Sequence, residues 1–393
     1  MYRIGQPELD ALRAVIDSKK LFRSGDPAAG HQQAVIAFER EWAATIGTDY
    51  SLCLSGGGTA ALVCALAALG IGPGDEVIVP AYTWMATACA VLNVGAIPVI
   101  AEIDETLALD PADVERKLSR HTRAIIPVYM VGRPANLAAL QAIAAREKLF
   151  LVEDAAQGCG GSYRGQRLGS FGDIGCFSFN DFKILSCGEG GALVTRDRTL
   201  YDRARIYHDS LVGFKTFAND LSVPPFVGLQ FRASEIMGAI LRVQLTRLDG
   251  LLADLRRVGR RFDEALGDVL TLAPSNDPEG DCRVVVAYRF PSEASARDFA
   301  TAPGVGGVLP IDTGRHVYAN WDALLQRRAS HHPDWDPLTH PKNLGLNSRY
   351  TPDLCPRTLD LLARTVYVFI NPDWTEAEIA IRITALRDAA VRL

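Results

Sequence analysis

Residues 177–195 of the chain are FSFNDFKILSCGEGGALVT. The apolar segments at both ends are typical of strands, and the loop of residues 180–190 between them is too short and too rich in glycine for a helix. Lys183 lies in this loop between Phe182 and Ile184. Apolar surroundings lower the pKa of a lysine, and the neutral amine can form a Schiff base with a carbonyl. A lone loop lysine is also compatible with a side chain that extends into solvent.

The chain before this loop alternates short apolar runs with helical patterns, which predicts an α/β fold with a mostly parallel central sheet sandwiched by helices. The runs are almost entirely apolar, so we expect both faces of the sheet to be buried. They are residues 51–55, 77–80, 97–103, 124–129, 149–154, 174–179 and 191–195. Helices are predicted at residues 59–69, 112–118 and 137–146. Asp110 and Asn136 precede the last two as capping residues.

A change of pattern near residue 250 predicts two domains. A long helical pattern covers residues 234–266, and the apolar run 283–290 is typical of a strand. We therefore expect a large domain in residues 1–250 and a smaller C-terminal α/β domain in residues 251–393. Residues 316–347 are rich in Trp, His and Pro and have little periodicity, which favours a functional segment.

The composition is that of a folded protein with an ample apolar core. Of 393 residues, 48% are hydrophobic and 22% charged, which excludes global disorder. The 41 basic and 46 acidic residues give a net charge of −5, and without a basic cluster we expect no nucleic-acid partner. The eight cysteines are scattered without a CxxC pair, so we expect free thiols in a reducing cytoplasm and no metal site. The N-terminal residues lack the apolar core of a signal peptide, and we expect no membrane span.

Two more clusters follow predicted strands and could bind a ligand. SGGGTAAL, residues 55–62, opens a helix, so its backbone N–H groups could bind a phosphate or form only a tight turn. In EDAAQ, residues 153–157, Asp154 ends a strand. Its carboxylate could reach a ligand in the crevice where parallel strands end, or could cap the segment that follows.

Together the three clusters resemble the DegT/DnrJ/StrS family of sugar aminotransferases. The most specific features are Ser178, five positions before Lys183, and the GEGG turn of residues 188–191. The resemblance implies fold type I and the cofactor pyridoxal 5′-phosphate. It also implies ping-pong transfer of an amino group from L-glutamate or L-glutamine to a ketone or aldehyde of a sugar, sugar acid or related biosynthetic intermediate.

The resemblance assigns roles to the residues that match the family's motifs. It implies that Lys183 binds the cofactor covalently and that an anionic Asp154 keeps the pyridine nitrogen protonated. Gln157 would hydrogen-bond the phenolic oxygen, and Trp84 would stack on the pyridine ring. The residues expected to hold the phosphate are Gly58, Thr59 and Ser178.

The sequence departs from the family pattern at two positions. Family members often have Asn in a GxNxR segment, where it reaches the phosphate of the neighbouring subunit, but GLQFR, residues 228–232, has Gln230. The amide is retained on a longer stem, so the resemblance still implies a homodimer with shared active sites. A histidine that is common near the lysine is replaced by Asn180, which weakens the expectation of a nucleotide-linked sugar substrate.

Substrate contacts are expected from two segments. Arg23 belongs to the N-terminal active-site loop that the resemblance implies in residues 1–30, and its guanidinium could bind a carboxylate. His316 and Asn320 are candidates from the Trp/His/Pro-rich segment, with Trp321 packed beside them.

A narrower likeness concerns the acceptor. IDETL at residues 103–107, the GEGG turn, DPEGD at residues 277–281 and the His-x-x-x-Asn-Trp pattern at residues 316–321 are similar to the branch that aminates an eight-carbon 3-deoxy-octulosonate sugar acid. Another ketone or aldehyde, including a cyclitol, is also compatible with the sequence.

Two other functions share this fold. A sugar dehydratase binds the same cofactor but has histidine in place of the lysine, so Lys183 argues against it. A cofactor-binding regulatory protein without turnover is the other alternative, and only an assay excludes it.

Overall fold

The computed structural model describes residues 3–213 and 220–392. Its centre is a seven-stranded sheet whose spatial order is β1 (Tyr50–Leu54), β9 (Gly191–Thr195), β8 (Ile174–Ser178), β5 (Phe150–Asp154), β4 (Thr122–Ile125), β2 (Glu76–Pro80) and β3 (Ile97–Ala101). The strands from β8 to β3 pair in parallel, whereas β9 is antiparallel to both of its neighbours. The predicted mostly parallel sheet is therefore confirmed.

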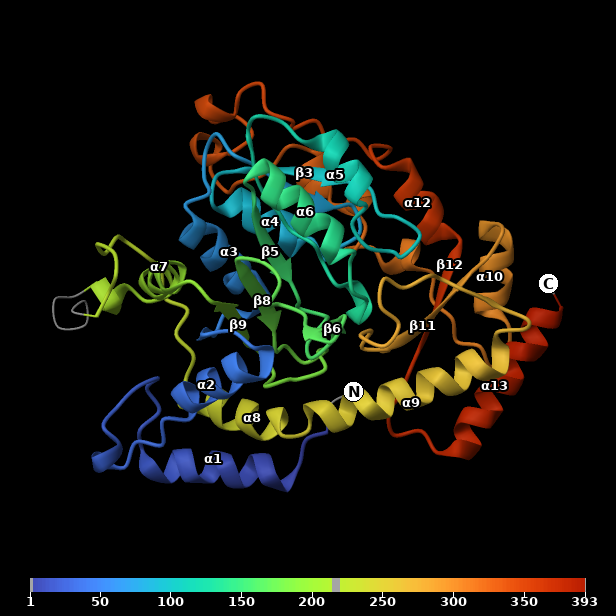
Figure 1. Ribbon diagram of the computed structural model, residues 1–393, viewed down its shortest axis with the longest axis horizontal. Helices are drawn as coiled ribbons and strands as arrows, with labels where there is room; N and C mark the ends of the chain where they lie inside the picture. The colour runs from blue at the N-terminus through green and yellow to red at the C-terminus, as the bar shows by residue number, and fades with distance from the viewer. Residues whose placement is uncertain (1–2, 214–219, 393) are drawn as a thin grey trace.

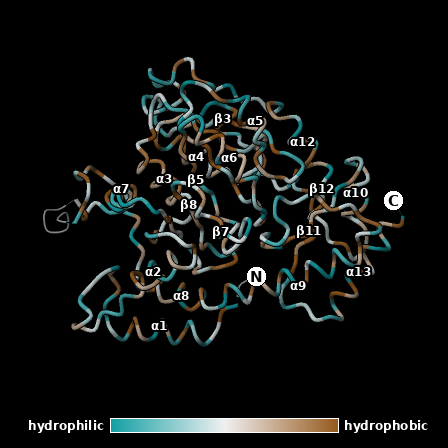
Figure 2. The backbone as a smooth tube through the Cα atoms, viewed as in Figure 1, coloured by the Kyte–Doolittle hydropathy of each residue, from teal (hydrophilic) through white to brown (hydrophobic). Residues whose placement is uncertain are grey.

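The strands are buried because they are apolar on both faces. Every residue of β2, β3, β8 and β9 is buried, and hydrophobic residues follow these strands through the middle of the molecule (Figure 2). The predicted run 124–129 is interrupted, because Pro127 has no N–H to donate. Pairing resumes after it as a single bridge between Val128 and Asp154.

Helices cover the sheet (Figure 1). They are α3 (Gly57–Leu69), α4 (Ala86–Asn93), α5 (Pro111–Lys117), α6 (Leu137–Glu147) and α7 (Arg198–His208). Both predicted caps are confirmed: the Asp110 side chain accepts a hydrogen bond from the Ala112 N–H, and that of Asn136 accepts one from the Ala139 N–H. A short hairpin of β6 (Ser162–Tyr163) and β7 (Gln166–Arg167) follows β5.

The predicted long helix over residues 234–266 is wrong in one respect, because it is two helices, α8 (Glu235–Leu245) and α9 (Leu248–Leu266). At the break, Thr246 N–H and Arg247 N–H bond to carbonyls three residues back, at Val243 and Gln244, which tightens the turn. The two helices run end to end below the sheets (Figure 1).

The N-terminal segment expected to be a loop contains helix α1 (Gln6–Ser18), which packs along α8 (Figure 1). The helix forms because the Glu8 carboxylate accepts a hydrogen bond from the Gly5 N–H, which caps its first turn. Helix α2 (Ala34–Ile46) follows, and the buried Glu235 carboxylate of α8 accepts hydrogen bonds from its first two amides.

A second, antiparallel sheet follows α9. Its strands are β10 (Thr271–Leu272), β11 (Val285–Arg289) and β12 (Thr365–Phe369), and the helices of this part are α10 (Glu293–Thr301), α11 (Asp322–Leu325), α12 (Pro356–Ala363) and α13 (Glu376–Val391). The predicted domain boundary between residues 250 and 251 falls in the first turn of α9, and it stays a prediction. Residues 316–347 form turns, short 3-10 helices and the four-residue helix α11, as the lack of periodicity indicated.

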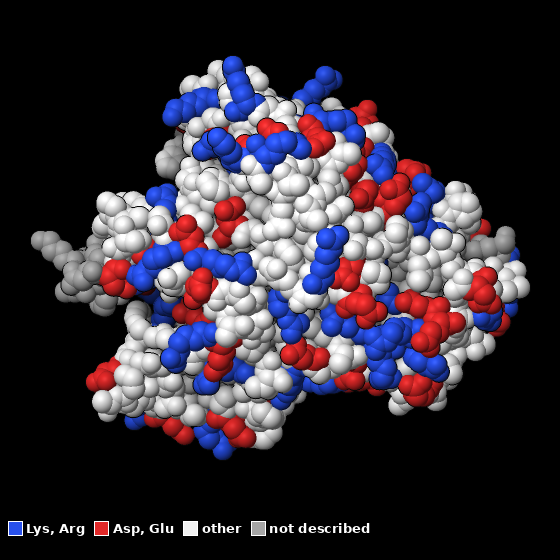
Figure 3. All heavy atoms as spheres, viewed as in Figure 1, with Lys and Arg blue, Asp and Glu red and all other residues white. Residues whose placement is uncertain are grey.

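Basic and acidic side chains are interspersed over the face drawn in Figure 3. None of the helices formed by residues 3–213 and 220–392 combines the length and the apolarity needed to cross a membrane. The eight cysteines are free thiols, most of them buried. The cytoplasmic location stays a prediction.

Candidate active site

Lys183 lies in the connection between β8 and β9. Its backbone N–H donates to the Asn180 carbonyl (3.0 Å), and the Asn180 side chain accepts a hydrogen bond from the Phe182 N–H (3.0 Å), so a tight turn fixes the lysine. The side chain is partly buried, and this burial lowers the pKa of Lys183, although the negative charges of Asp154 and Glu189 act in the opposite direction. The Lys183 amine, whose pKa is lowered, is thus within electrostatic range of a buried carboxylate.

Asp154 is that carboxylate, at the carboxyl end of β5, where it is only 4% exposed. Its Oδ2 accepts a hydrogen bond from the Thr87 hydroxyl (2.8 Å), and its Oδ1 accepts one from the Ala156 N–H (3.2 Å). Burial raises the pKa of Asp154, while these donors and the charge of Lys183 oppose the rise. A cation bound next to Asp154 would offset the cost of this burial.

The glycine turn at residues 56–59 begins α3 beside the ends of β5 and β8. Gly57 has a φ of +70°, which favours glycine, and Gly56 supplies no side-chain cap. A Cβ atom on Gly58 would lie 3.1 Å from the Ser178 Cβ, so the start of α3 and the Ser178 hydroxyl share one small space. Helix amides in the first turn lack partners within the helix, and they attract anions.

Trp84 and His316 come together from opposite halves of the chain. Their ring centres are 5.2 Å apart, and the Thr83 N–H donates to the His316 carbonyl (2.9 Å). Burial, together with the positive charges of Lys183 and Arg315, lowers the pKa of His316 to about 4. His316 is therefore neutral near pH 7 and belongs to the Lys183 surroundings.

Two predicted amides are placed near the site without contacting Lys183. Gln157 accepts a hydrogen bond at its Oε1 from the Val131 N–H (2.9 Å), which fixes the orientation of its amide. Gln230 is exposed, and the next residue, Phe231, accepts a hydrogen bond from the Ser55 N–H (2.8 Å) at the start of the glycine turn.

The structure does not bring Arg23 to the group around Lys183. Its guanidinium forms a two-pronged ion pair with the Glu39 carboxylate (2.7 and 2.9 Å), which also accepts a hydrogen bond from the Cys53 N–H. Arg23 and Glu39 line a separate hollow of about 570 Å³, together with Tyr201 and His208. The guanidinium of Arg23 is thus already paired, which the sequence alone does not indicate.

Asn320 is exposed, and its side chain donates to the Gly314 carbonyl (3.1 Å), so its amide is engaged within its own loop. Trp321 is buried, as expected for a packing residue, and its indole N–H donates to the Arg315 carbonyl (3.0 Å). Both side chains therefore hold the loop that carries His316.

Two residues of the site were not predicted from the sequence. Thr87 donates to Asp154, and the Arg315 guanidinium carbon lies 4.9 Å from the centre of the Trp84 ring. Thr87 follows Trp84 by three positions at the start of α4, which is the spacing of neighbours on a helix. For Arg315 the only signal is its place next to His316.

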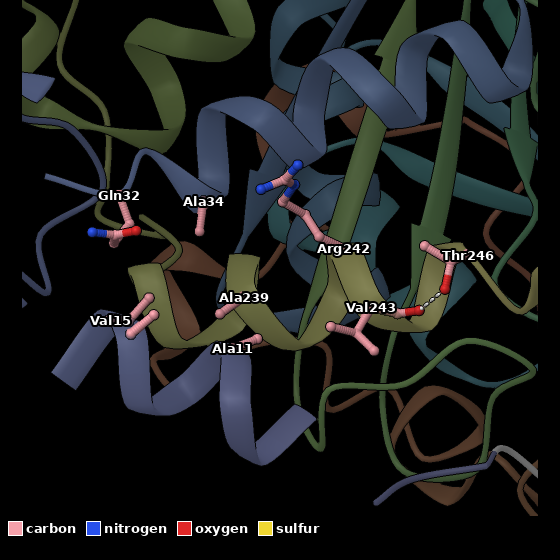
Figure 4. Close-up of a pocket in the computed structure, with 9 residues that line it drawn as sticks. Ala11, Val15, Gln32, Ala34, Ala239, Arg242, Val243 and Thr246 are labelled. Atoms are coloured by element: carbon pink, nitrogen blue, oxygen red, sulfur yellow. Dashed lines mark hydrogen bonds between the residues drawn. The ribbon is translucent and has the colours of Figure 1, made fainter. Parts of the chain in front are cut away.

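A further hollow, of about 450 Å³, lies between α1, α2 and α8 (Figure 4). Its lining residues are Ala11, Ala14, Val15, Gln32, Ala34, Ala239, Arg242, Val243 and Thr246. Arg242 is already paired with Glu41 (2.7 Å). This hollow contains none of the residues that the sequence singled out.

The arrangement around Lys183 fits a phosphorylated pyridine aldehyde. The open start of α3 and Ser178 suit a phosphate, and Trp84, 42% exposed, presents a ring for stacking. The buried Asp154 lacks a hydrogen-bonded cation within the described part of the chain and suits a protonated ring nitrogen. Lys183 suits an aldehyde carbon.

Comparisons with known proteins agree with this chemistry. The sequence profile of the DegT/DnrJ/EryC1/StrS aminotransferase family matches residues 3–301. The chain is 40% identical, over 272 residues, to the L-glutamine:2-deoxy-scyllo-inosose aminotransferase of Micromonospora echinospora, a match that covers 66% of this chain and 63% of the relative. It is 39% identical, over 265 residues, to the UDP-N-acetyl-3-dehydro-alpha-D-glucosamine 3-aminotransferase of Acidithiobacillus ferrooxidans, which covers 67% and 69% of the two chains.

The fold is similar to solved structures as well. The crystal structure of DesV from S. venezuelae, in complex with a ketimine intermediate, superposes with a TM-score of 0.73 and 29% identity. The superposition covers 98% of this chain and 95% of that one.

Proposed function

Because this chain belongs to the DegT/DnrJ/EryC1/StrS aminotransferase family, we propose that the centre around Lys183 and Asp154 transfers an amino group from L-glutamine or L-glutamate to a ketone of a polyhydroxylated ring. The prediction of a pyridoxal 5′-phosphate-dependent aminotransferase is confirmed by the family match and the named relatives. The observation that carries the proposed centre is the buried Asp154 carboxylate within electrostatic range of the half-buried Lys183 amine.

Lys183 is the proposed acid and base. Bound pyridoxal 5′-phosphate would supply an electron sink for the carbon that carries the amino group. The Lys183 Nζ would take the proton from the donor's α-carbon in the first half-reaction and return a proton to the acceptor's carbon in the second. The lowered pKa of Lys183 supports this role, because it increases the neutral fraction of the amine.

Asp154 is the proposed partner of the ring nitrogen. Its two hydrogen bonds, from Thr87 and from the Ala156 N–H, hold the carboxylate in one orientation. A negative charge in this buried place would favour the protonated nitrogen. Thr87 is thus a positioning residue.

The remaining predicted contacts are part of the same proposal. Gly58, Thr59 and Ser178 would bind the phosphate, which their position at the open start of α3 supports. Trp84 would stack on the pyridine ring. The free NH₂ of Gln157 would donate to the phenolic oxygen, since its Oε1 is occupied by Val131.

For the acceptor, we propose a cyclitol ketone. Support comes from the named relative that acts on 2-deoxy-scyllo-inosose. A ring of this kind carries hydroxyl groups and no charge. The neutral His316 beside Trp84 would be a suitable hydrogen-bond partner for such hydroxyls.

An eight-carbon 3-deoxy-octulosonate is the second candidate acceptor, favoured by His316 in the His-x-x-x-Asn-Trp pattern. In two of the other segments with this likeness, the side chain of Asn276, next to DPEGD, donates to the Thr106 hydroxyl of IDETL (2.9 Å). These two segments pack against each other, which favours a structural role for them.

The acceptor proposal is tested in the second half-reaction. The enzyme is first converted with L-glutamine and freed of donor, and it is then mixed with 2-deoxy-scyllo-inosose, with the C8 aldehyde of a 3-deoxy-octulosonate, or with a UDP-linked 3-keto sugar. We expect the cyclitol ketone to restore the original visible spectrum at least about tenfold faster than the other two, a difference of about 1.4 kcal/mol in activation free energy. Faster recovery with either of the others would contradict the proposal.

We also infer that two copies of the chain share their active sites. Large apolar side chains are exposed beside the site: Phe182 is 82%, Val227 94% and Leu229 48% exposed. They flank Lys183 and Gln230, and the exposed Gln230 amide would reach a neighbouring phosphate. Covering these side chains with a second copy would remove apolar surface from water.

Charged substitutions on this surface should separate the subunits. We expect the double variant Val227→Asp, Leu229→Asp to be monomeric by light scattering and to lose affinity for pyridoxal 5′-phosphate, because each site then lacks the partner's Gln230. Ile381→Asp, on the exposed face of α13, is the matched control and should change neither property. A monomeric variant with full activity would overturn the inference.

A further inference from the structure

Arg315 is a free cation beside the proposed active site. It is exposed, and its guanidinium lies over the Trp84 ring at 4.9 Å. It has no ion pair or side-chain hydrogen bond with any residue in the described ranges. Two other arginines near the end of β1 already form ion pairs, Arg23 with Glu39 and Arg232 with Asp209.

The loop that carries Arg315 is held in place from both sides. The Asn320 and Trp321 side chains donate to the carbonyls of Gly314 and Arg315 (3.1 and 3.0 Å). On the other side, the Tyr318 N–H donates to the Ala81 carbonyl (3.0 Å), in the same segment as Trp84. The backbone that carries Arg315 is therefore held in place before a ligand binds, which reduces the entropy lost on binding.

The contact with Trp84 leaves the N–H groups of the guanidinium available to a ligand. The guanidinium carbon lies 4.9 Å from the ring centre, and within the described residues no oxygen accepts a hydrogen bond from the Arg315 side chain. Two parallel N–H groups match the two oxygens of a carboxylate, and an ammonium cannot reproduce this fork. Trp84 contacts both Arg315 (4.9 Å) and the His316 ring (5.2 Å between centres), and the charges of Lys183 and Arg315 both lower the pKa of His316.

We propose that Arg315 binds the α-carboxylate of the amino donor, an inference that rests on the proposed function. In every α-amino acid the carboxylate is attached to the carbon that Lys183 is proposed to deprotonate. A forked cation beside Trp84 and His316 would thus orient the donor for proton transfer. The cyclitol acceptor has no carboxylate, so the contact distinguishes the two half-reactions.

The test uses the cofactor-loaded enzyme and three variants. Arg315→Gln removes the charge, Arg315→Lys keeps the charge without the fork, and Arg328→Gln is a control at an exposed arginine of the same segment. Binding of 2-oxoglutarate is measured by calorimetry, without turnover. Each half-reaction is measured separately by stopped-flow absorbance, with L-glutamine or L-glutamate for the first.

We expect Arg315→Gln to weaken 2-oxoglutarate binding and to raise the half-saturating donor concentration by roughly 10- to 100-fold, the usual effect of losing a charged hydrogen bond. Arg315→Lys should lie between Arg315→Gln and the wild type, and Arg328→Gln should behave as the wild type. The acceptor half-reaction should slow far less than the donor half-reaction in the two Arg315 variants, and it should be unchanged in Arg328→Gln.

Unchanged 2-oxoglutarate binding in Arg315→Gln would overturn the inference. A defect confined to the acceptor half-reaction would also overturn it, because Arg315 would then contact the acceptor and not the donor. Failure of the proposed function gives a different result, because the wild type would then bind 2-oxoglutarate but not react with either donor.

Discussion

The Lys183→Ala variant should lose the visible absorption of lysine-bound cofactor, and its amino transfer should slow by roughly 10²–10⁴-fold, the usual contribution of a positioned acid and base. The amine is proposed to act twice in each cycle, once in each half-reaction, so both should be slow. The variant should fold, because the backbone of the turn is held by Asn180 and not by the lysine side chain. Absorbance spectra before and after addition of L-glutamate measure both effects.

Two further variants make this result specific. Lys342→Ala removes an exposed lysine far along the chain and should leave the spectrum and the rate unchanged. Lys183→Arg keeps a positive charge near Asp154 but has no titrating amine at neutral pH, so it should be as slow as Lys183→Ala. Turnover above a tenth of the wild-type rate in either Lys183 variant would rule out the proposed base.

Asp154→Asn should weaken cofactor binding by about 2–5 kcal/mol, the range for losing one partner of a buried, hydrogen-bonded charge pair. The replacement is similar in shape. Its oxygen can accept from the Ala156 N–H, and its NH₂ can donate to the Thr87 hydroxyl. The variant then loses only the negative charge. The ring nitrogen should be protonated less often, and the rate of amino transfer should fall for that reason.

In the absence of cofactor, Asp154→Asn should not destabilise the protein, in contrast to its expected weakening of cofactor binding. Because burial raises the pKa of Asp154, the ionised carboxylate costs folding free energy at pH 7, above its unfolded pKa. Asp154→Asn removes this cost, so its melting temperature without cofactor should equal or exceed that of the wild type. Thr87→Val keeps the charge but removes one donor, so it should lower the rate by up to about tenfold. A large drop in melting temperature for Asp154→Asn would indicate a structural role instead.

The parts of this fold that the sequence predicts are those fixed by neighbouring residues. The buried strands are apolar at most positions, and the caps Asp110 and Asn136 bond to amides only two or three residues away. The turn that holds Lys183 is local as well. The break between α8 and α9 was missed because both sides of it have the same helical period, and only the turn at residues 246–247 separates them.

Contacts between distant segments account for what the sequence could not predict. Arg23 has the chemistry of a carboxylate-binding residue, but the fold places Glu39 opposite its guanidinium. Arg315 meets Trp84 only because the segment after β11 returns to the end of β2, where Val317 bridges to Tyr82. The residues next to Arg23 and Arg315 in the sequence do not indicate that Arg23 forms an ion pair and that Arg315 contacts Trp84.

The position of β1 at the sheet edge determines when this strand can pair during synthesis of the chain. β1 precedes the glycine turn, yet its hydrogen-bonding partner is β9, which leaves the ribosome much later. The loop with Arg315 and His316 follows later still. A nascent chain therefore carries β1 unpaired until β9 has emerged, and a messenger truncated before codon 191 would yield an aggregation-prone fragment that also lacks the loop with Arg315 and His316.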